Sequence, residues 1–237
     1  MKQVSSAIRP AERLIVALDV PTPQEARVLV EKLGDAARFY KIGLELFTAE
    51  GYFELLGWLT ARGNKVFADL KLYDIPETVR RAVANLRRHG ATFLTVHGHR
   101  SVMEAAAREK GDMKILAVTV LTSFDQRDLA EMGSSLSVEQ LVLARARGAV
   151  ECRCDGVIAS GLEAQALKKE FKQRLLVVTP GIRPEATSDD QKRTVNVAQA
   201  FANGADYIVV GRPIREAQDP RAAAEQIQST IAGIFKS

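Results

Sequence analysis

The sequence predicts an α/β protein that folds as a single (β/α)8 barrel domain over residues 1–237, with residues 1–12 as a short N-terminal extension. Short apolar, β-rich runs recur at intervals of roughly 20 to 40 residues, and each precedes an amphipathic helical pattern. No shift of composition and no linker rich in Pro, Gly or Ser interrupts this series. Strict alternation of strand and helix requires a parallel sheet, and about eight such units favour a closed barrel over a doubly wound sheet.

The individual elements follow from the same patterns. Eight runs of β-branched and other apolar residues are expected to be strands: Leu14–Val20, Phe39–Leu46, Lys65–Leu72, Phe93–His97, Lys114–Leu121, Gly156–Ser160, Leu175–Thr179 and Tyr207–Val210. The amphipathic patterns between and after them are expected to be helices: Pro23–Gly34, Ala49–Arg62, Pro76–His89, Ser101–Lys110, Ser137–Ala149, Leu162–Phe171, Val195–Asn203 and Pro220–Phe235.

The third expected strand carries charges where a buried strand should have none. Side chains alternate along a strand, so one of its faces is wholly apolar and the other carries Asp69 and Lys71. Burying an unpaired charge is costly, so these groups need each other, further partners or a polar cavity. A third charge, Asp74, falls in the loop after the strand, because Ile75 before Pro76 disfavours helix and Pro76 suits the first helical turn.

The neighbouring strands decide between a functional site and an ordinary solvated strand edge. In a barrel, residues that face inward become polar only at the C-terminal rim, where enzymes of this fold keep their active sites. The alternation rule puts Asp19, Lys41, Asp69 and Lys71, and then His97, on the inward face near the ends of the first four strands. A solvated edge explains one such strand but not four in succession, so the pattern indicates an active site.

Two later loops are expected to bind an anion. The sequence TPGIRPEATSDDQKR follows the seventh strand and VVGRPI follows the eighth, and loops in these positions commonly bind phosphate in this fold. Gly211 permits close approach of the backbone, and Arg212 offers a bidentate contact. The long loop Gly181–Gln191 is expected to act as a lid, with Arg183 and Gln191 as closing contacts, although a merely variable surface loop is the alternative.

Composition and the distribution of apolar residues argue against a membrane-spanning or a secreted protein. A content of 46% hydrophobic and 26% charged residues is ordinary for a soluble globular protein. No apolar run is long enough to span a bilayer, and Met1–Pro10 lacks the hydrophobic segment of a secretory signal, so a cytoplasmic protein is expected. The net charge of +4 suits either a nucleic acid or an anionic small molecule as the ligand.

The cysteines and histidines give weak evidence for a metal. Cys152 and Cys154 are too close in sequence for an unstrained bridge and have no further Cys to complete a zinc site, so free thiols in a reducing compartment are expected. His97 and His99 have a spacing that can chelate a metal. A structural hydrogen bond for His97 is expected in place of a metal site.

Seven short motifs lie in register with the expected strands and loops. They are ALD at Ala17–Asp19, KIG at Lys41–Gly43, DLKLYDIPET at Asp69–Thr78, TVH at Thr95–His97, LTS at Leu121–Ser123, TPGIRP at Thr179–Pro184 and VVGRPI at Val209–Ile214. Together they resemble the orotidine 5′-phosphate decarboxylase family over nearly the whole chain. The resemblance implies a homodimeric TIM barrel that converts orotidine 5′-phosphate (OMP) to UMP and CO2 in pyrimidine biosynthesis, without a metal or an organic cofactor.

The resemblance also implies roles for individual residues. Four charged residues are implied to be catalytic, namely Lys41, Asp69, Lys71 and Asp74, with Lys71 stabilising and then protonating the carbanion at C6 of the pyrimidine. Asp74 is implied to reach the partner subunit's site. The implied substrate contacts are Asp19 and Lys41 at the ribose, Thr122 and Ser123 at the pyrimidine, Ile75 and Thr78 from the partner, and Arg183, Gln191, Gly211 and Arg212 at the phosphate, with Pro180 also lining the site.

Two rival functions stay open on the sequence. Magnesium-dependent 3-keto-L-gulonate 6-phosphate decarboxylases and hexulose-phosphate synthases share the Asp-x-Lys-x-x-Asp string, but they carry an acidic metal ligand on the second strand, where this chain has Lys41. A basic RNA-binding protein on a barrel scaffold is the other rival. The chain lacks the interleaved aromatic and basic residues that stack bases, so no nucleic-acid partner and no membrane partner are expected.

Overall fold

The computed structural model describes residues 8–183 and 193–235, and within them eight parallel strands close into a barrel in chain order. The strands are β1 (Leu14–Ala17), β2 (Phe39–Gly43), β3 (Lys65–Leu72), β4 (Phe93–His97), β5 (Lys114–Val118), β6 (Gly156–Ile158), β7 (Leu176–Thr179) and β8 (Tyr207–Val210). Strand β8 pairs back onto β1, with Ile15 opposite Val209, so the barrel has no free edge. The predicted (β/α)8 fold is therefore confirmed.

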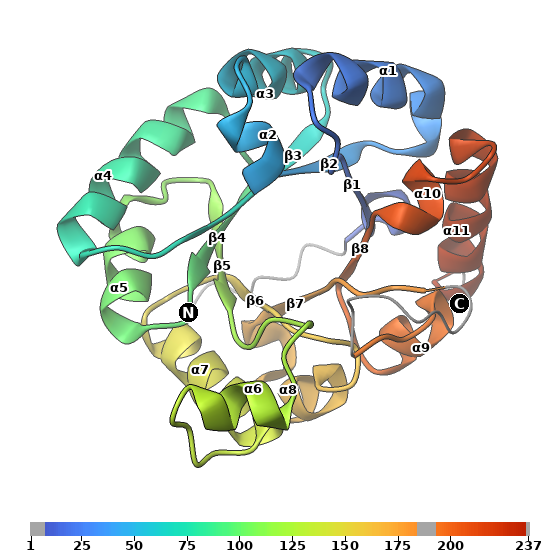
Figure 1. The fold of residues 1–237 in the computed structure, drawn as a ribbon. Coiled ribbons are helices and arrows are strands. Elements are labelled where there is room, and N and C mark those ends of the chain that lie inside the picture. Colours follow the sequence, from blue (N-terminus) through green and yellow to red (C-terminus); the bar gives the residue numbers. More distant parts are fainter. Residues whose placement is uncertain (1–7, 184–192, 236–237) are drawn as a thin grey trace.

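Helices surround the barrel and cover the outer side of its strands (Figure 1). They are α1 (Pro23–Leu33), α2 (Leu44–Thr48), α3 (Tyr52–Ala61), α4 (Pro76–Leu86), α5 (Arg100–Glu109), α6 (Gln126–Glu131), α7 (Val138–Glu151), α8 (Ala164–Phe171), α9 (Val197–Ala202), α10 (Arg212–Arg215) and α11 (Pro220–Ile234). Several begin at side chains that cap them, such as Thr22, which accepts a hydrogen bond from Glu25 N–H at the start of α1. The expected N-terminal extension is described from Ile8 onward and contains the 3-10 turn Pro10–Glu12.

Three strands, β3, β4 and β8, have the predicted bounds, and the other predicted elements differ from the structure by up to three residues at an end. Strands β1 and β5 each end three residues earlier than predicted, at Ala17 and Val118. The second strand is the main correction. The sequence predicts strand up to Leu46, whereas the strand ends at Gly43 and Leu44–Thr48 form the short helix α2. The physical reason is burial, because the helical turn places Leu46 fully inside the core while Leu44 stays exposed. Helices α6 and α10 were not predicted, since segments of six and four residues are too short for a helical period to be recognised.

The core has two layers that follow the alternation of side chains along each strand. One apolar cluster lies between the strands and the helices and includes Val66 and Ala68. The other fills the inside of the barrel, where Phe39, Phe93 and Tyr207, each the first residue of its strand, meet edge to face with ring centroids 4.9 to 5.9 Å apart. This aromatic layer closes the N-terminal part of the barrel interior, so any cavity in it lies toward the C-terminal ends of the strands.

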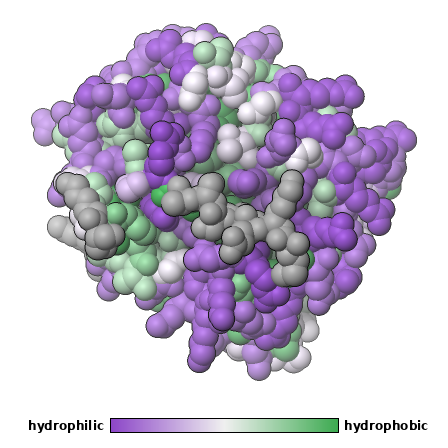
Figure 2. All heavy atoms as spheres, turned by 180° about the vertical axis from the view of Figure 1, so that it is seen from behind, coloured by the Kyte–Doolittle hydropathy of each residue, from purple (hydrophilic) through white to green (hydrophobic). Residues whose placement is uncertain are grey.

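The face of the molecule seen in Figure 2 is mostly hydrophilic. Figure 2, which views the molecule from behind relative to Figure 1, shows hydrophilic side chains over most of the visible face and hydrophobic ones only in small areas. In the part of the chain that the structure describes, every helix is too short or too polar to cross a lipid bilayer.

Candidate active site

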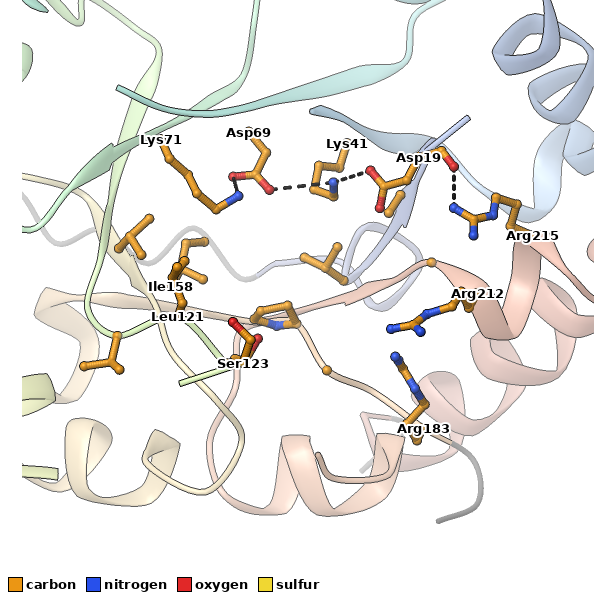
Figure 3. Close-up of a pocket in the computed structure, with 18 residues that line it drawn as sticks. Asp19, Lys41, Asp69, Lys71, Leu121, Ser123, Ile158, Arg183, Arg212 and Arg215 are labelled. Carbon is orange, nitrogen blue, oxygen red and sulfur yellow. Dashed lines mark hydrogen bonds and ion pairs between the residues drawn. The ribbon is translucent and has the colours of Figure 1, made fainter. Parts of the chain in front are cut away.

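Four charged side chains form a row at the C-terminal ends of the first three strands (Figure 3). Lys41 Nζ lies 2.6 Å from Asp19 Oδ1 and 3.6 Å from Asp69 Oδ2, and Lys71 Nζ lies 2.9 Å from Asp69 Oδ1. The order along the row is therefore acid, base, acid, base. The structure brings together the charges that alternation along the strands places on the inward face.

Burial and pairing together set the charge states in this row. Burial alone would raise the pKa of Asp69, but the cations of Lys41 and Lys71 and hydrogen bonds from Lys71 and Thr95 outweigh it, so the pKa of Asp69 lies below its ordinary value. Burial alone would lower the pKa of Lys41, but the carboxylates of Asp69 and Asp19 outweigh it, so the pKa of Lys41 is raised. Both groups are thus ionised at neutral pH, although Lys41 is only 9% exposed.

Gly43 keeps room for this arrangement. A Cβ atom on residue 43 would lie 3.2 Å from Lys41 Nζ and 3.6 Å from Asp19 Oδ1. The first contact is tight and the second is an ordinary van der Waals contact, so a larger residue would require the ammonium to shift by a few tenths of an ångström. The glycine of the KIG motif is therefore explained by the space that the lysine head group needs.

The row borders a cavity of about 480 Å³ that opens at the C-terminal rim. This volume lies in the range of small-molecule sites. The charged row forms one wall, and Leu121, Ser123 and Ile158 lie opposite it (Figure 3). Thr122 and Pro180 also line the cavity. The two expected pyrimidine contacts, Thr122 and Ser123, both line this cavity.

Three arginines gather at one end of the cavity, where the loops after β7 and β8 meet. Arg183 follows β7 and is buried, and Arg212 is the first residue of α10 directly after Gly211. Arg215 was not predicted; its guanidinium donates a hydrogen bond to the backbone carbonyl of Asp19. Arg215 also pairs with the carboxylate of Glu216 at 2.6 Å, so Arg183 and Arg212 beside Gly211 are the groups that suit a dianion such as a phosphate monoester. Gln191, the other expected phosphate contact, lies outside the described residues.

Strand β3 departs from regular geometry where the sequence predicted plain alternation. Ala68 pairs with Leu94 and Leu72 with Val96, so a bulge separates the two pairs. Lys71 lies in this bulge with φ of 47°, which is the left-handed region that a non-glycine residue rarely adopts. Strain of this kind often accompanies functional residues. The alternation rule cannot detect a bulge, so nothing in the strand pattern signalled it.

The three expected contributions to a partner's site lie away from the cavity. Asp74, Ile75 and Thr78 are exposed and are not among the residues that line it. The Asp74 carboxylate accepts a hydrogen bond from the N–H of Ile75 at 2.6 Å, which holds it in the loop before α4. Within one chain, the row therefore ends at Lys71.

The histidines and cysteines are not among the residues that line the cavity. The rings of His97 and His99 each lie 4.9 Å from that of Tyr73, and burial, followed by the charge of Arg145, lowers the pKa of His97. Cys152 and Cys154 are buried free thiols, and burial raises the pKa of Cys154 to about 12. Among the described residues, no three His, Cys, Asp or Glu side chains are grouped as a metal site would require.

A second buried ion pair, which sequence reasoning missed, supports the wall opposite the row. Arg193 lies 2.5 Å from Glu163 and donates to the backbone carbonyls of Val120 and Leu121. It joins the segment that follows residues 184–192 to the loops after β5 and β6. An isolated arginine in a polar stretch gives no sequence signal of such a role.

The chain is similar to known proteins over almost its full length. The model of the Orotidine 5'-phosphate decarboxylase / HUMPS family matches residues 12–227. The chain is 58% identical over 227 residues to "Orotidine 5'-phosphate decarboxylase" of Methylococcus capsulatus, which covers 95% of this chain and 94% of that protein. The protein of the same name from Stenotrophomonas maltophilia is 49% identical over 235 residues, with 98% of each chain covered.

A solved structure agrees with these sequence matches. The crystal structure of orotidine 5'-phosphate decarboxylase from Lactobacillus acidophilus superposes with a TM-score of 0.83 at 36% identity, and it covers 93% of this chain and 99% of that one. A family match over most of the chain, relatives that are matched over more than nine-tenths of their length and a shared barrel all agree. This chain belongs to the Orotidine 5'-phosphate decarboxylase / HUMPS family.

Proposed function

We propose that this protein is an orotidine 5′-phosphate decarboxylase, a carboxy-lyase that converts OMP to UMP and CO2. One observation carries the proposal: the Lys71 ammonium, 2.9 Å from the Asp69 carboxylate, faces a cavity whose far end holds three arginines. The relatives that are 58% and 49% identical bear this name and support it. A nucleoside monophosphate has the charge distribution that these two ends of the cavity complement.

The substrate is oriented by its phosphate. In this proposal Arg183, Arg212 and the backbone at Gly211 bind the phosphate, and Asp19 and Lys41 bind the ribose hydroxyls. Thr122, Ser123 and Pro180 then line the pyrimidine, and its carboxylate lies beside Asp69 and Lys71. Because the phosphate contacts are remote from C6, their binding energy can position the reacting end and exclude water from it.

Lys71 supplies the main catalytic effect. When the bond from C6 to the carboxylate breaks, its electron pair stays on C6 and CO2 leaves. A fixed ammonium beside C6 stabilises that developing charge and then transfers its proton to C6, which gives UMP and a neutral lysine. The lysine regains a proton from solvent before the next turnover.

Asp69 has two effects on the substrate carboxylate. Two negative charges about 4 Å apart repel by roughly 4 kcal/mol at an effective dielectric of 20, and the departure of CO2 removes that repulsion. Asp69 also anchors both lysines, through its two oxygens. Lys41 thereby stays charged in a buried position and fixes the carboxylate between the two ammonium groups.

We further propose a cytoplasmic homodimer in which Asp74, Ile75 and Thr78 complete the partner's site. Apolar side chains that follow β2 and β3, namely Leu44, Phe47, Tyr73 and Ile75, are 44% to 67% exposed, and such a concentration of exposed apolar residues is typical of an interface. The Asp74 carboxylate is not used by its own cavity. Placed beside the partner's Lys71, it would continue the alternation of charges.

The position of Lys41 argues against the magnesium-dependent sugar-phosphate enzymes. Its ammonium lies between the carboxylates of Asp19 and Asp69, at 2.6 and 3.6 Å. Those are the oxygens that a divalent cation would need, and a fixed cation between them repels it. The proposed decarboxylation accordingly includes no metal, and the proposal includes no organic cofactor either.

A direct assay tests the proposal. OMP is mixed with the purified protein, and its loss is followed by ultraviolet absorbance with and without excess EDTA, while UMP is identified by chromatography. We expect stoichiometric conversion that EDTA does not change. Absence of OMP turnover by folded protein would overturn the proposal, and turnover of a sugar phosphate that EDTA abolishes and Mg²⁺ restores would favour the rival enzymes. RNA binding without OMP turnover would favour the binding protein.

A further inference from the structure

The bulge in β3 is linked to the charged row by one side chain of β4. Thr95 is fully buried. Its Oγ1 accepts a hydrogen bond from the backbone N–H of Lys71 at 3.0 Å and donates one to Asp69 Oδ1 at 2.8 Å. Since Asp69 Oδ1 also lies 2.9 Å from Lys71 Nζ, the backbone of Lys71, the hydroxyl, the carboxylate and the ammonium form a closed ring.

We propose that Thr95 is a positioning residue, whose hydroxyl holds Lys71 in its left-handed conformation and orients Asp69, so that the ammonium is aimed at the reacting carbon. This inference rests on the proposed decarboxylase activity. Thr95 is absent from the residues that line the cavity, so it acts through Lys71 and Asp69 and does not touch the substrate.

The chemistry of the link requires a hydroxyl. One oxygen must accept from a backbone N–H and donate to a carboxylate at the same time, which Ser and Thr can do and Val cannot. The left-handed conformation of Lys71 is intrinsically unfavourable for a residue with a Cβ, so it persists only where neighbouring contacts hold it. Without the hydroxyl, the N–H of Lys71 loses an acceptor and Asp69 Oδ1 loses one of its two donors.

The geometry also predicts which kinetic constant changes. The phosphate contacts proposed for Arg183 and Arg212 lie at the other end of the cavity from Lys71 and Asp69, the two residues that Thr95 contacts. Misalignment of the ammonium therefore reduces the chemical step and leaves nucleotide binding nearly unchanged. A displacement of a catalytic group by about 1 Å can cost on the order of a hundredfold in rate.

The experiment compares Thr95→Val, Thr95→Ser and the matched control Thr119→Val with the parent enzyme. Thr119 is also fully buried, on the segment that follows β5, but its hydroxyl donates to the backbone carbonyl of Ile158 and to no charged group. For each protein, kcat and KM for OMP are measured, together with the dissociation constant of UMP and the melting temperature.

We expect Thr95→Val to lower kcat by about a hundredfold while the dissociation constant of UMP changes less than about threefold. Thr95→Ser should restore most of kcat, and Thr119→Val should keep kcat near the parent value even where its melting temperature falls. A Thr95→Val enzyme with parental kcat, or a Thr95→Ser enzyme as slow as Thr95→Val, would overturn the inference. If the parent itself does not convert OMP, the proposed function fails instead.

Discussion

Replacement of Lys71 by alanine tests the central step. Lys71 Nζ borders the cavity, so a carbon of the ligand in van der Waals contact with it lies about 4 Å away. At an effective dielectric of 20, a cation stabilises a negative charge at that distance by about 4 kcal/mol, which corresponds to about a thousandfold in rate. Loss of a positioned acid costs a further factor of about 10² to 10⁴. We therefore expect kcat to fall by about five to seven orders of magnitude.

The matched control is Lys110→Ala. Lys110 also pairs with an aspartate, Asp155, at 2.7 Å, and its side chain is 22% exposed, against 29% for Lys71. Turnover is measured as loss of OMP absorbance, and folding by circular dichroism and urea denaturation. Lys110→Ala should alter stability and leave kcat unchanged, whereas Lys71→Ala should stay folded and inactive. A Lys71→Ala enzyme within about tenfold of the parent would refute the role assigned to the ammonium.

Three further predictions concern the partner subunit, the phosphate and pH. Mixing inactive Asp74→Ala with inactive Lys71→Ala protein should restore roughly a quarter of parental activity, because half of the randomly exchanged dimers are mixed and each of these has one complete site out of two. Subunit exchange is verified by mass spectrometry. If exchange occurs and no activity returns, Asp74 acts in its own chain's site. Arg212→Ala should raise KM and lower kcat for OMP but leave turnover of orotidine, which lacks the phosphate, nearly unchanged. An equal loss of kcat/KM for both substrates would show that Arg212 does not bind the phosphate. Because the pKa of Asp69 is lowered on folding, its contribution to stability is complete above the unfolded value of about 3.9 and is lost as pH falls through the lower folded value. Asp69→Asn should thus flatten the decline of unfolding free energy below about pH 4, measured by urea denaturation, and an unchanged slope would speak against the ion pairs.

The sequence predicted the barrel and the inward charges for physical reasons that the structure makes plain. A strand buried on both sides must be apolar except at the rim, so Asp19, Lys41 and Asp69 were recognisable as exceptions. The second strand was predicted too long because Leu44 and Leu46 continue an apolar run that strand and helix accommodate equally well.

Other features depend on contacts between segments that are far apart in sequence, or between two chains, and a local sequence pattern does not reveal such contacts. The bulge at Lys71 arises from the pairing of β3 with β4, and the part played by Thr95 follows from that pairing. Arg215 reaches Asp19 from the end of a four-residue helix, a contact between residues that are far apart in sequence. The place of Asp74 depends on a second chain, so it stays a prediction.

The aromatic layer beneath the charged row determines how molecules enter and leave. Because the rings of Phe39, Phe93 and Tyr207 block the barrel axis, the proposed site is a blind chamber with its opening at the rim. The nucleotide, the CO2 product and the proton that returns to Lys71 would all pass through that opening. The three rings at the N-terminal ends of the strands thus leave the C-terminal rim as the common route for substrate and products.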